Sequence, residues 1–471
     1  MAYLHVFPRR RVIGVLLFLV AVTCIVIFLR TEHGAYLLKY ANDTIRPTTS
    51  TKPPHPRYKP TPTYTPAPIT DPFPLLATST PPPVPRWNQP RENLHRDYGL
   101  PVAPPLLIGF TRSWPLLLQA VVSYITAGWP PSQIFVVENT GVHGANADGK
   151  LTLQNPFFLD HRALRSLGIN VVRTPVLLSF AQLQNFFLSL SYERGWPYYF
   201  WSHMDVLVLS YEDGFDGAMP PYHDPGYKTV YELCCSALAE ARRIGGEGED
   251  GEGRPRWGLR FFSYDHLALV NPAAYEDVGG WDTLIPYYYT DCDMHSRLNM
   301  ARWSMENQRA GIVVDVSTVL SDLLVLYRVP GISPSFTDPN PPPPVKRAAN
   351  DSGEMSSGQG DVAASAEAKD GGGKGEEDEN LKSWRAILHT SDAMFHYKNG
   401  PRGRNMWQTA QHGGQGEAFH YDAAGFAEGV EVITEAGKEV YRRKWGHRGC
   451  DLITGAGLNI SDQWQVKKDW R

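Results

Sequence analysis

Carboxylates and one histidine in two short segments of the chain have the types and spacing needed for chemistry. His203 and Asp205 interrupt an apolar run, and Asp291 and Asp293 follow a Gly-Gly-Trp-Asp sequence that ends at Asp282. Carboxylate oxygens are the ligands that hard divalent cations prefer, and a carboxylate near a hydroxyl can remove its proton as a general base. Asp205 therefore fits a metal-binding role, and Asp291 fits a general-base role.

Each aspartate also has a structural interpretation. Asp205 could cap a turn after a strand, and Asp282 could fix the turn that the two glycines form. Asp291 could be the N-cap of a helix that begins directly after it, with Asp293 in the first turn, where negative charge is favourable. Arg297 lies four residues after Asp293, so we expect these two side chains to form an ion pair on one helix face.

The surrounding sequence alternates between short apolar runs and segments with helical spacing. Strands are expected at 106–111, 133–138, 169–173, 198–209 (interrupted at 202–205) and 259–270, and helices at 116–127 and 179–194. This alternation predicts an α/β domain built on a mostly parallel sheet. Ligands of such sheets bind beyond the carboxyl ends of the strands, where Glu138, Asn139 and the triplet 203–205 lie.

Four segments, 106–125, 134–141, 198–210 and 279–298, resemble the GT-A-fold, nucleotide-sugar-dependent glycosyltransferases of the family 2 type. The resemblance covers about residues 106–322 and implies a Rossmann-like, mostly parallel sheet flanked by helices. It also implies a nucleotide-diphosphate sugar as the donor and a hydroxyl of a glycan, glycoprotein or glycolipid as the acceptor. The transfer would be inverting and metal-dependent, with Mn²⁺ or Mg²⁺ as the cofactor.

The same resemblance gives roles to residues at the strand ends. Glu138 and Asn139 would lie beside the nucleobase. The triplet from His203 to Asp205 matches a D-x-D motif, whose last aspartate binds the metal that holds the donor diphosphate. His203 stands where the family has the first aspartate, which normally contacts the donor ribose.

The acidic segment near residue 290 receives roles in the same way. Trp281, Asp282 and Asp293 would contact the acceptor, and Asp291 would be the catalytic base. Thr290 stands where the family has the first acid of its Glu-Asp pair.

A histidine far downstream is often the third metal ligand in such enzymes. His396 is the preferred candidate, because it ends a short apolar run, and His389 and His412 are the others. Lys398 could bind the diphosphate, or it could belong to a solvated basic loop.

The first 105 residues predict a membrane anchor and a stem. Residues 12–29 are uncharged and apolar and follow three arginines, which predicts an uncleaved, single-pass membrane helix with residues 1–11 in the cytoplasm. A cleaved signal peptide is the alternative. Residues 30–105 form a Pro-rich luminal stem, since 18 of the 39 prolines lie between 47 and 105. The glycosyltransferase domain would span 106–471, interrupted by low-complexity inserts at 245–255 and 338–382.

Composition excludes several other classes of protein. A net charge of −4 argues against binding to nucleic acid through bulk electrostatics. Five cysteines without paired spacings exclude a zinc ribbon, and their disulfide pairing cannot be deduced.

From the anchor, the stem and the family resemblance together, we expect a type II Golgi glycosyltransferase with its domain in the lumen. A catalytically inactive, sugar-binding relative and a luminal metal-dependent hydrolase are the alternatives.

Overall fold

The computed structural model describes residues 68–244, 256–337, 378–400, 413–417 and 423–470, together with 18–20, 22, 56 and 58. The chain divides into two compact units, Met1–Thr65 and Pro66–Arg471, and the second unit contains the fold described below. Most of the predicted anchor at 12–29 lies outside the described residues, and within them no helix is both long and apolar enough to span a membrane.

The second unit is built on a seven-stranded sheet with the order β3-β2-β1-β4-β7-β6-β8. These strands are β1 (Leu106–Phe110), β2 (Ile134–Glu138), β3 (Asn170–Arg173), β4 (Tyr199–Ser202), β6 (Arg256–Phe262), β7 (Leu267–Val270) and β8 (Trp303–Gln308). Only β7 is antiparallel to its neighbours, and the other pairs are parallel. The predicted α/β, Rossmann-like architecture with a mostly parallel sheet is confirmed.

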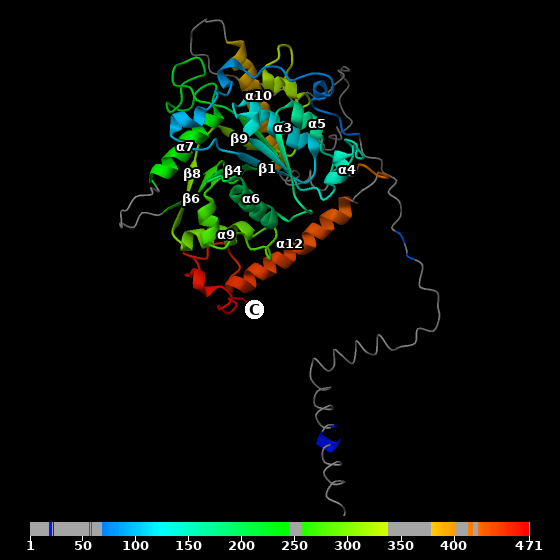
Figure 1. The fold of residues 1–471 in the computed structure, drawn as a ribbon, viewed down its shortest axis with the longest axis vertical. Coiled ribbons are helices and arrows are strands. Elements are labelled where there is room, and N and C mark those ends of the chain that lie inside the picture. Colours follow the sequence, from blue (N-terminus) through cyan, green and yellow to red (C-terminus); the bar gives the residue numbers. More distant parts are fainter. Residues whose placement is uncertain are drawn as a thin grey trace, which may run out of the picture. The chain divides into compact units, whose positions relative to one another are not determined.

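Helices cover both faces of this sheet (Figure 1). The helices are α3 (Trp114–Thr126), α4 (His143–Ala147), α5 (His161–Ser166), α6 (Phe180–Arg194), α7 (Val230–Ile244), α8 (Pro272–Asp277), α9 (Thr290–Met300), α10 (Glu379–Asn399) and α12 (Ala423–Trp445). Because side chains alternate along a strand, Leu106 and Ile108 of β1 enter the core shared with α3 and α7, whereas Leu107 enters the core shared with α6 and α9.

The apolar run 198–209 is divided between two sheets. The strand β4 ends at Ser202, and β5 (Val206–Leu209) leaves the main sheet to pair antiparallel with β9 (Ile312–Asp315). The turn between β4 and β5 contains the triplet 203–205, so the predicted interruption is confirmed.

The predicted strand 259–270 is wrong as a single element. Strands β6 and β7 are antiparallel and are joined by the turn Ser263–His266. Four polar residues interrupt the apolar run there, and Ser263 and Tyr264 have φ angles of 60° and 57° that reverse the chain.

Two predicted boundaries also differ from the structure. Phe73, Leu76 and Leu94, which we placed in the stem, are buried in the core of the domain. The helix α10 begins at Glu379, inside the segment 338–382 predicted to be low-complexity; residues 338–377 of that segment lie outside the described residues, as does the insert 245–255.

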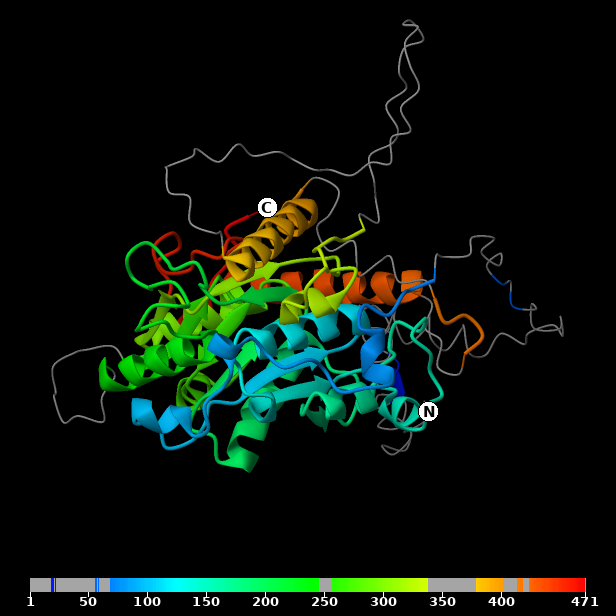
Figure 2. The ribbon, with the colours of Figure 1, turned by 90° about the horizontal axis from the view of Figure 1, so that it is seen from above.

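The C-terminal helix α12 is joined to the domain by covalent and ionic contacts. Cys292 in α9 forms a disulfide with Cys450, which follows α12. Cys234 and Cys235 are free and buried, so these adjacent residues are not bonded to each other. Figure 2 shows α10 and α12 as two separate long helices at the surface of the domain.

Candidate functional site

The turn after β4 is fixed by hydrogen bonds from two neighbouring elements. Tyr124 of α3 donates its hydroxyl to Ser202 Oγ at 2.8 Å, and Ser202 Oγ donates to the backbone oxygen of His266 at 2.8 Å. The backbone nitrogen of His203 donates to the same oxygen at 3.1 Å. The turn 203–205 and the β6–β7 turn are therefore held against each other at the carboxyl edge of the sheet.

Asp205 is engaged by a cation from another part of the chain. Lys398 Nζ donates to Asp205 Oδ2 at 2.7 Å and to Asp315 Oδ1 at 2.5 Å. The two carboxylates lie side by side because Val206, which follows Asp205, pairs with Asp315 in the small sheet. The Lys398 side chain is 4% exposed, so this ion cluster is buried.

His203 lies between two carboxylates. Its Nδ1 is 3.6 Å from Asp205 Oδ1, its Nε2 is 3.8 Å from Asp265 Oδ2, and its ring stacks on Trp201. Burial disfavours the charged ring, but Asp205 and Asp265 outweigh it and raise the pKa of His203 to about 10. Burial likewise opposes the charged form of Asp205, but His203 and Lys398 hold the pKa of that carboxyl well below its usual value.

The β6–β7 turn contributes functional groups that the sequence analysis missed. Asp265 faces His203, and His266 Nε2 lies 3.8 Å from Asp315 Oδ1. Burial and the charge on His203 lower the pKa of His266. Tyr264 is exposed and its hydroxyl donates to Asp291 Oδ2 at 3.5 Å. The polar tetrapeptide inside an apolar run was the available signal, and its left-handed backbone is the type of strain found at functional sites.

Asp291 and Asp293 have different surroundings, although both lie in the first turn of α9. Asp291 is partly exposed and faces Tyr264. The N-cap of α9 is Tyr289, so the structural interpretation of Asp291 as the N-cap is wrong. Burial lowers the pKa of the neighbouring His295. The negative charges of Asp291 and Asp265 act in the opposite direction, but burial outweighs them.

Asp293 is completely buried in a network of ionic contacts. It accepts from Arg297 Nε at 2.9 Å, from Trp445 Nε1 at 2.9 Å, and pairs with Lys444 Nζ at 2.7 Å. The predicted ion pair between Arg297 and Asp293 is confirmed. Both carboxylate oxygens of Asp293 are thus engaged by the protein, and the acceptor contact that we assigned to this residue stays a prediction.

Trp281 and Asp282 belong mainly to the framework. Trp281 is 3% exposed and packs edge-on against Phe180 and Tyr275. Asp282 accepts from the backbone nitrogen of Leu284 at 3.0 Å, which fixes the turn as expected, and pairs with Lys444 at 2.8 Å. Lys444 of α12 thus bridges Asp282 and Asp293.

Glu138 and Asn139 lie at the end of β2, as predicted, and both are buried. Glu138 bonds to His161 and to Asn146, each at 2.9 Å. Burial disfavours its charge, but these two partners and Thr140 hold the pKa of Glu138 below its ordinary value. Asn139 bonds to the backbone nitrogen of Leu178 at 2.7 Å and to its backbone oxygen at 2.9 Å. Both side chains position the loops around the end of β2.

His396 and Asp205 are not brought together. The His396 side chain is 73% exposed and lies 3.5 Å from Asp392 on the outer face of α10. Residues two positions apart point to different sides of a helix, and Lys398 is the one that faces Asp205. His412 lies outside the described residues.

The donor groups around Asp205 do not fit the divalent metal that the family resemblance implies. Asp205 and Asp315 each bond to the Lys398 ammonium, and the other oxygen of Asp205 lies 3.6 Å from Nδ1 of the adjacent His203. In the part of the chain that the structure describes, no three histidine, cysteine or acidic side chains are grouped so that they could hold a metal ion.

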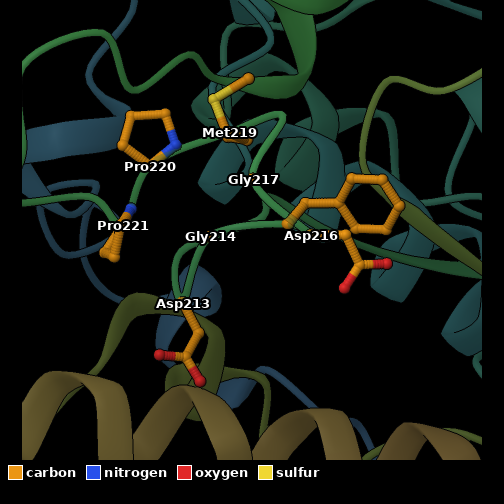
Figure 3. A pocket seen from close by; sticks show the side chains of 8 residues that line it. Asp213, Gly214, Asp216, Gly217, Met219, Pro220 and Pro221 are labelled. Carbon is orange, nitrogen blue, oxygen red and sulfur yellow. The ribbon is translucent and has the colours of Figure 1, made fainter.

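Two hollows lie near the carboxyl edge of the sheet. One has a volume of 360 Å³ and includes Tyr264, the partner of Asp291, in its lining. The other has a volume of 580 Å³ and is lined by residues 213–217 and 219–221 (Figure 3). Asp213 in this second hollow is already bonded to Arg385 of α10 at 2.8 Å, and Phe215 lines both hollows.

No family model matches the chain, and no curated protein matches it. Among solved structures, a mannosyltransferase from Pyrobaculum calidifontis, in complex with GDP-Man and Mn²⁺, is similar over 46% of this chain and 60% of its own, less than two thirds of its length, at 12% identity and a TM-score of 0.26. A cytidylyltransferase from Leptospira borgpetersenii is similar over 45% of this chain and 82% of its own, at 8% identity and a TM-score of 0.26. These are distant similarities to two transferases, and we base the functional proposal on the residues of the site.

Proposed function

We propose that this protein is an inverting glycosyltransferase that moves a sugar from a nucleotide diphosphate to an acceptor hydroxyl. The observation that carries the proposal is the position of Asp291. It is a partly exposed carboxylate at the carboxyl edge of an α/β sheet, whereas Asp293 of the same segment is buried and paired. Substrates can therefore reach Asp291.

In this reaction Asp291 accepts the proton of the acceptor hydroxyl while the hydroxyl oxygen attacks the anomeric carbon. The bond between that carbon and the phosphate oxygen breaks on the opposite side, which inverts the configuration. The Tyr264 hydroxyl orients the Asp291 carboxylate. Arg112 follows the end of β1 at the same edge and is a candidate partner for the diphosphate, because guanidinium groups bind phosphate in two-point contacts. Mn²⁺ or Mg²⁺ is the cofactor that the family resemblance implies.

A transfer assay with matched variants tests this role. The purified domain is incubated with a panel of nucleotide sugars, and hydrolysis and transfer are measured for the wild type, Asp291→Asn and Asp293→Asn. Asp291→Asn should bind the donor normally and lose about 10²–10⁴-fold in kcat, the usual contribution of a positioned base.

Asp293→Asn is the control. It should lower the free energy of unfolding by about 3–5 kcal/mol, because Arg297 and Lys444 lose a buried partner, while the folded fraction keeps most of its kcat. Transfer at the wild-type rate by Asp291→Asn would contradict the base assignment.

We also propose that the domain is luminal, on a type II Golgi membrane protein. The disulfide Cys292–Cys450 supports this location, because such bonds persist in oxidising compartments. The arginines and the apolar run at 12–29 are its other support.

A catalytically inactive, sugar-binding relative is the second candidate function. The observation in its favour is that Asp205, the expected metal ligand, is bonded to Lys398. Binding of a nucleotide sugar without hydrolysis of any donor in the panel would support this candidate over the transferase.

A further inference from the structure

The ammonium of Lys398 has its full set of hydrogen-bond partners. It donates to Asp205 Oδ2 at 2.7 Å, to Asp315 Oδ1 at 2.5 Å and to the backbone oxygen of Val316 at 3.2 Å. A lysine ammonium has three protons, so three acceptors satisfy it. The three acceptors therefore form a cation-binding site, and the Lys398 ammonium occupies it.

The chain places Lys398 there through three separate elements. The pairing of β5 with β9 brings the two carboxylates together, and Lys398 enters from the last turn of α10. On the other side of Asp205, Nδ1 of His203 lies 3.6 Å from Oδ1. Both oxygens of Asp205 therefore face a nitrogen of the chain.

A divalent metal and this ammonium exclude each other. Metal–oxygen bonds to carboxylates are about 2.0–2.6 Å long, so an ion shared by Asp205 and Asp315 would occupy nearly the same point as Lys398 Nζ. Asp205 is buried and the adjacent Asp315 is partly buried, so the two carboxylates need a positive charge nearby, and the Lys398 ammonium supplies it.

We propose that Lys398 replaces the divalent metal at the strand-end carboxylates, so that this site works without Mn²⁺ or Mg²⁺. The consequence for sugar transfer rests on the proposed function, whereas the exclusion of the metal rests on the contacts of Lys398 alone. Lys398 is then a positioning residue, which neutralises Asp205 and fixes α10 to the end of β4.

The first test measures metal binding by the wild type. Mn²⁺ bound to the full-length protein is titrated by electron paramagnetic resonance up to about 1 mM, where a carboxylate site of moderate affinity fills, and the same titration is made with Asp205→Asn. The two proteins should bind equal amounts of Mn²⁺. One equivalent of Mn²⁺ that the wild type binds and Asp205→Asn loses would overturn the proposal.

The second test opens the site. Lys398→Met keeps an unbranched side chain that is one atom shorter and uncharged, so Asp205 and Asp315 should gain one bound Mn²⁺, and Mn²⁺ should raise the melting temperature of this variant. Adding Asp205→Asn should abolish that gain. Lys444→Met is the matched control, because Lys444 also bridges two aspartates, but Asp293 keeps Arg297 and Trp445 as partners. A folded Lys398→Met protein that binds no more Mn²⁺ than the wild type would contradict the proposal, and if it does not fold, the first test decides.

Activity measurements separate this inference from the proposed function. With any donor that the wild type uses, treatment with EDTA should change the rate by less than about twofold. A rate lost in EDTA and restored by Mn²⁺ would refute metal independence while supporting the transferase. An absence of activity towards every donor would refute the transferase, and the Mn²⁺ titrations would still test the role of Lys398.

Discussion

Several acidic residues at the carboxyl edge of the sheet are bonded to other parts of the chain and stabilise the fold. Glu138 holds the loop after β2 through His161 and Asn146, Asp205 anchors α10 through Lys398, and Asp293 anchors α12 through Lys444. Removing one partner of such a buried pair leaves a charge without compensation and is strongly destabilising. Substitutions at these positions must therefore be assessed by folding as well as by activity.

Glu138 gives a prediction for the pH dependence of stability. Its pKa in the folded protein lies below the ordinary value of 4.5, because the hydrogen bonds from His161 and Asn146 outweigh burial. The ionised form therefore stabilises the fold above about pH 4.5, and this contribution is lost as the pH falls through the lowered pKa. Glu138→Gln should lower the free energy of unfolding by about 1–3 kcal/mol at pH 7, and the difference should shrink in acid.

Urea unfolding of both proteins at several pH values between 7 and 3.5 measures this difference. A difference that stays constant over the whole range would show that the Glu138 charge contributes nothing. Asp160→Asn is a control, because its carboxylate caps α5 in the same region at a more exposed position.

The sequence alone could place the strand-end residues but not their partners. Glu138, His203 and Asp205 were found because each follows an apolar run, and the Arg297–Asp293 pair follows from a spacing of four. The contact of Lys398 with Asp205 spans 193 positions, so no local pattern contains it.

The spacing of the buried residues along α10 is the sequence pattern that could have identified Lys398. Trp384, Ile387, Ser391, Met394 and Lys398 are buried and recur every three or four residues, so they form one face of the helix. His396 falls outside this stripe and is exposed. We preferred His396 among the histidines because it ends a short apolar run, whereas the helical period of the buried residues selects Lys398.

At the scale of elements, strands and helices with one clear apolar run were predicted well. The helix α6 begins after Ser179, which forms a capping box with Gln182, and ends at Gly195, as its sequence signals indicate. The β6–β7 hairpin was missed because its turn lacks glycine and proline, although Ser263 and Asp265 are residue types that favour turns. The pairing of β5 with β9 was missed because it joins segments about a hundred residues apart.

The disulfide gives a prediction at this scale. Cys292 and Cys450 are 158 residues apart, so the bond restricts the unfolded chain strongly and ties the segment after α12 to α9. Cys450→Ser should lower the free energy of unfolding by about 2–5 kcal/mol, measured by thermal or urea unfolding. A reducing agent should destabilise the wild type similarly and leave Cys450→Ser unchanged. Equal stability of the oxidised wild type and the variant would contradict this role.

At the scale of the whole molecule, composition predicted the α/β domain but not its limits. Residues from Phe73 onwards have the Pro-rich composition of a stem, yet Phe73, Leu76 and Leu94 are buried in the domain. The few apolar side chains in such a segment can dock on a neighbouring core, and composition averaged over the segment hides them. Neither the helix α12 nor its attachment through Lys444 follows from the resemblance, which fades beyond residue 322.

The topology of the full-length protein can be tested at a glycosylation sequon near its C-terminus. If the arginines before residue 12 keep the N-terminus in the cytoplasm, the whole domain enters the lumen, and the Asn459-Ile460-Ser461 sequon becomes available for glycosylation. Asn459 is exposed, and its side chain accepts a hydrogen bond from the backbone of Asp462, so the amide nitrogen that carries a glycan is not the capping atom.

When the full chain is expressed in microsomes, its C-terminal domain should therefore resist added protease. Its electrophoretic mobility should change after treatment with an endoglycosidase. Asn459→Gln and Ser461→Ala should each abolish the part of this change that arises at Asn459; Ser461→Ala does so while leaving the asparagine cap in place. The two variants should thus agree in glycosylation even if they differ in stability. Digestion of the C-terminal domain in intact microsomes, without detergent, would place the domain on the cytoplasmic side and contradict the luminal assignment.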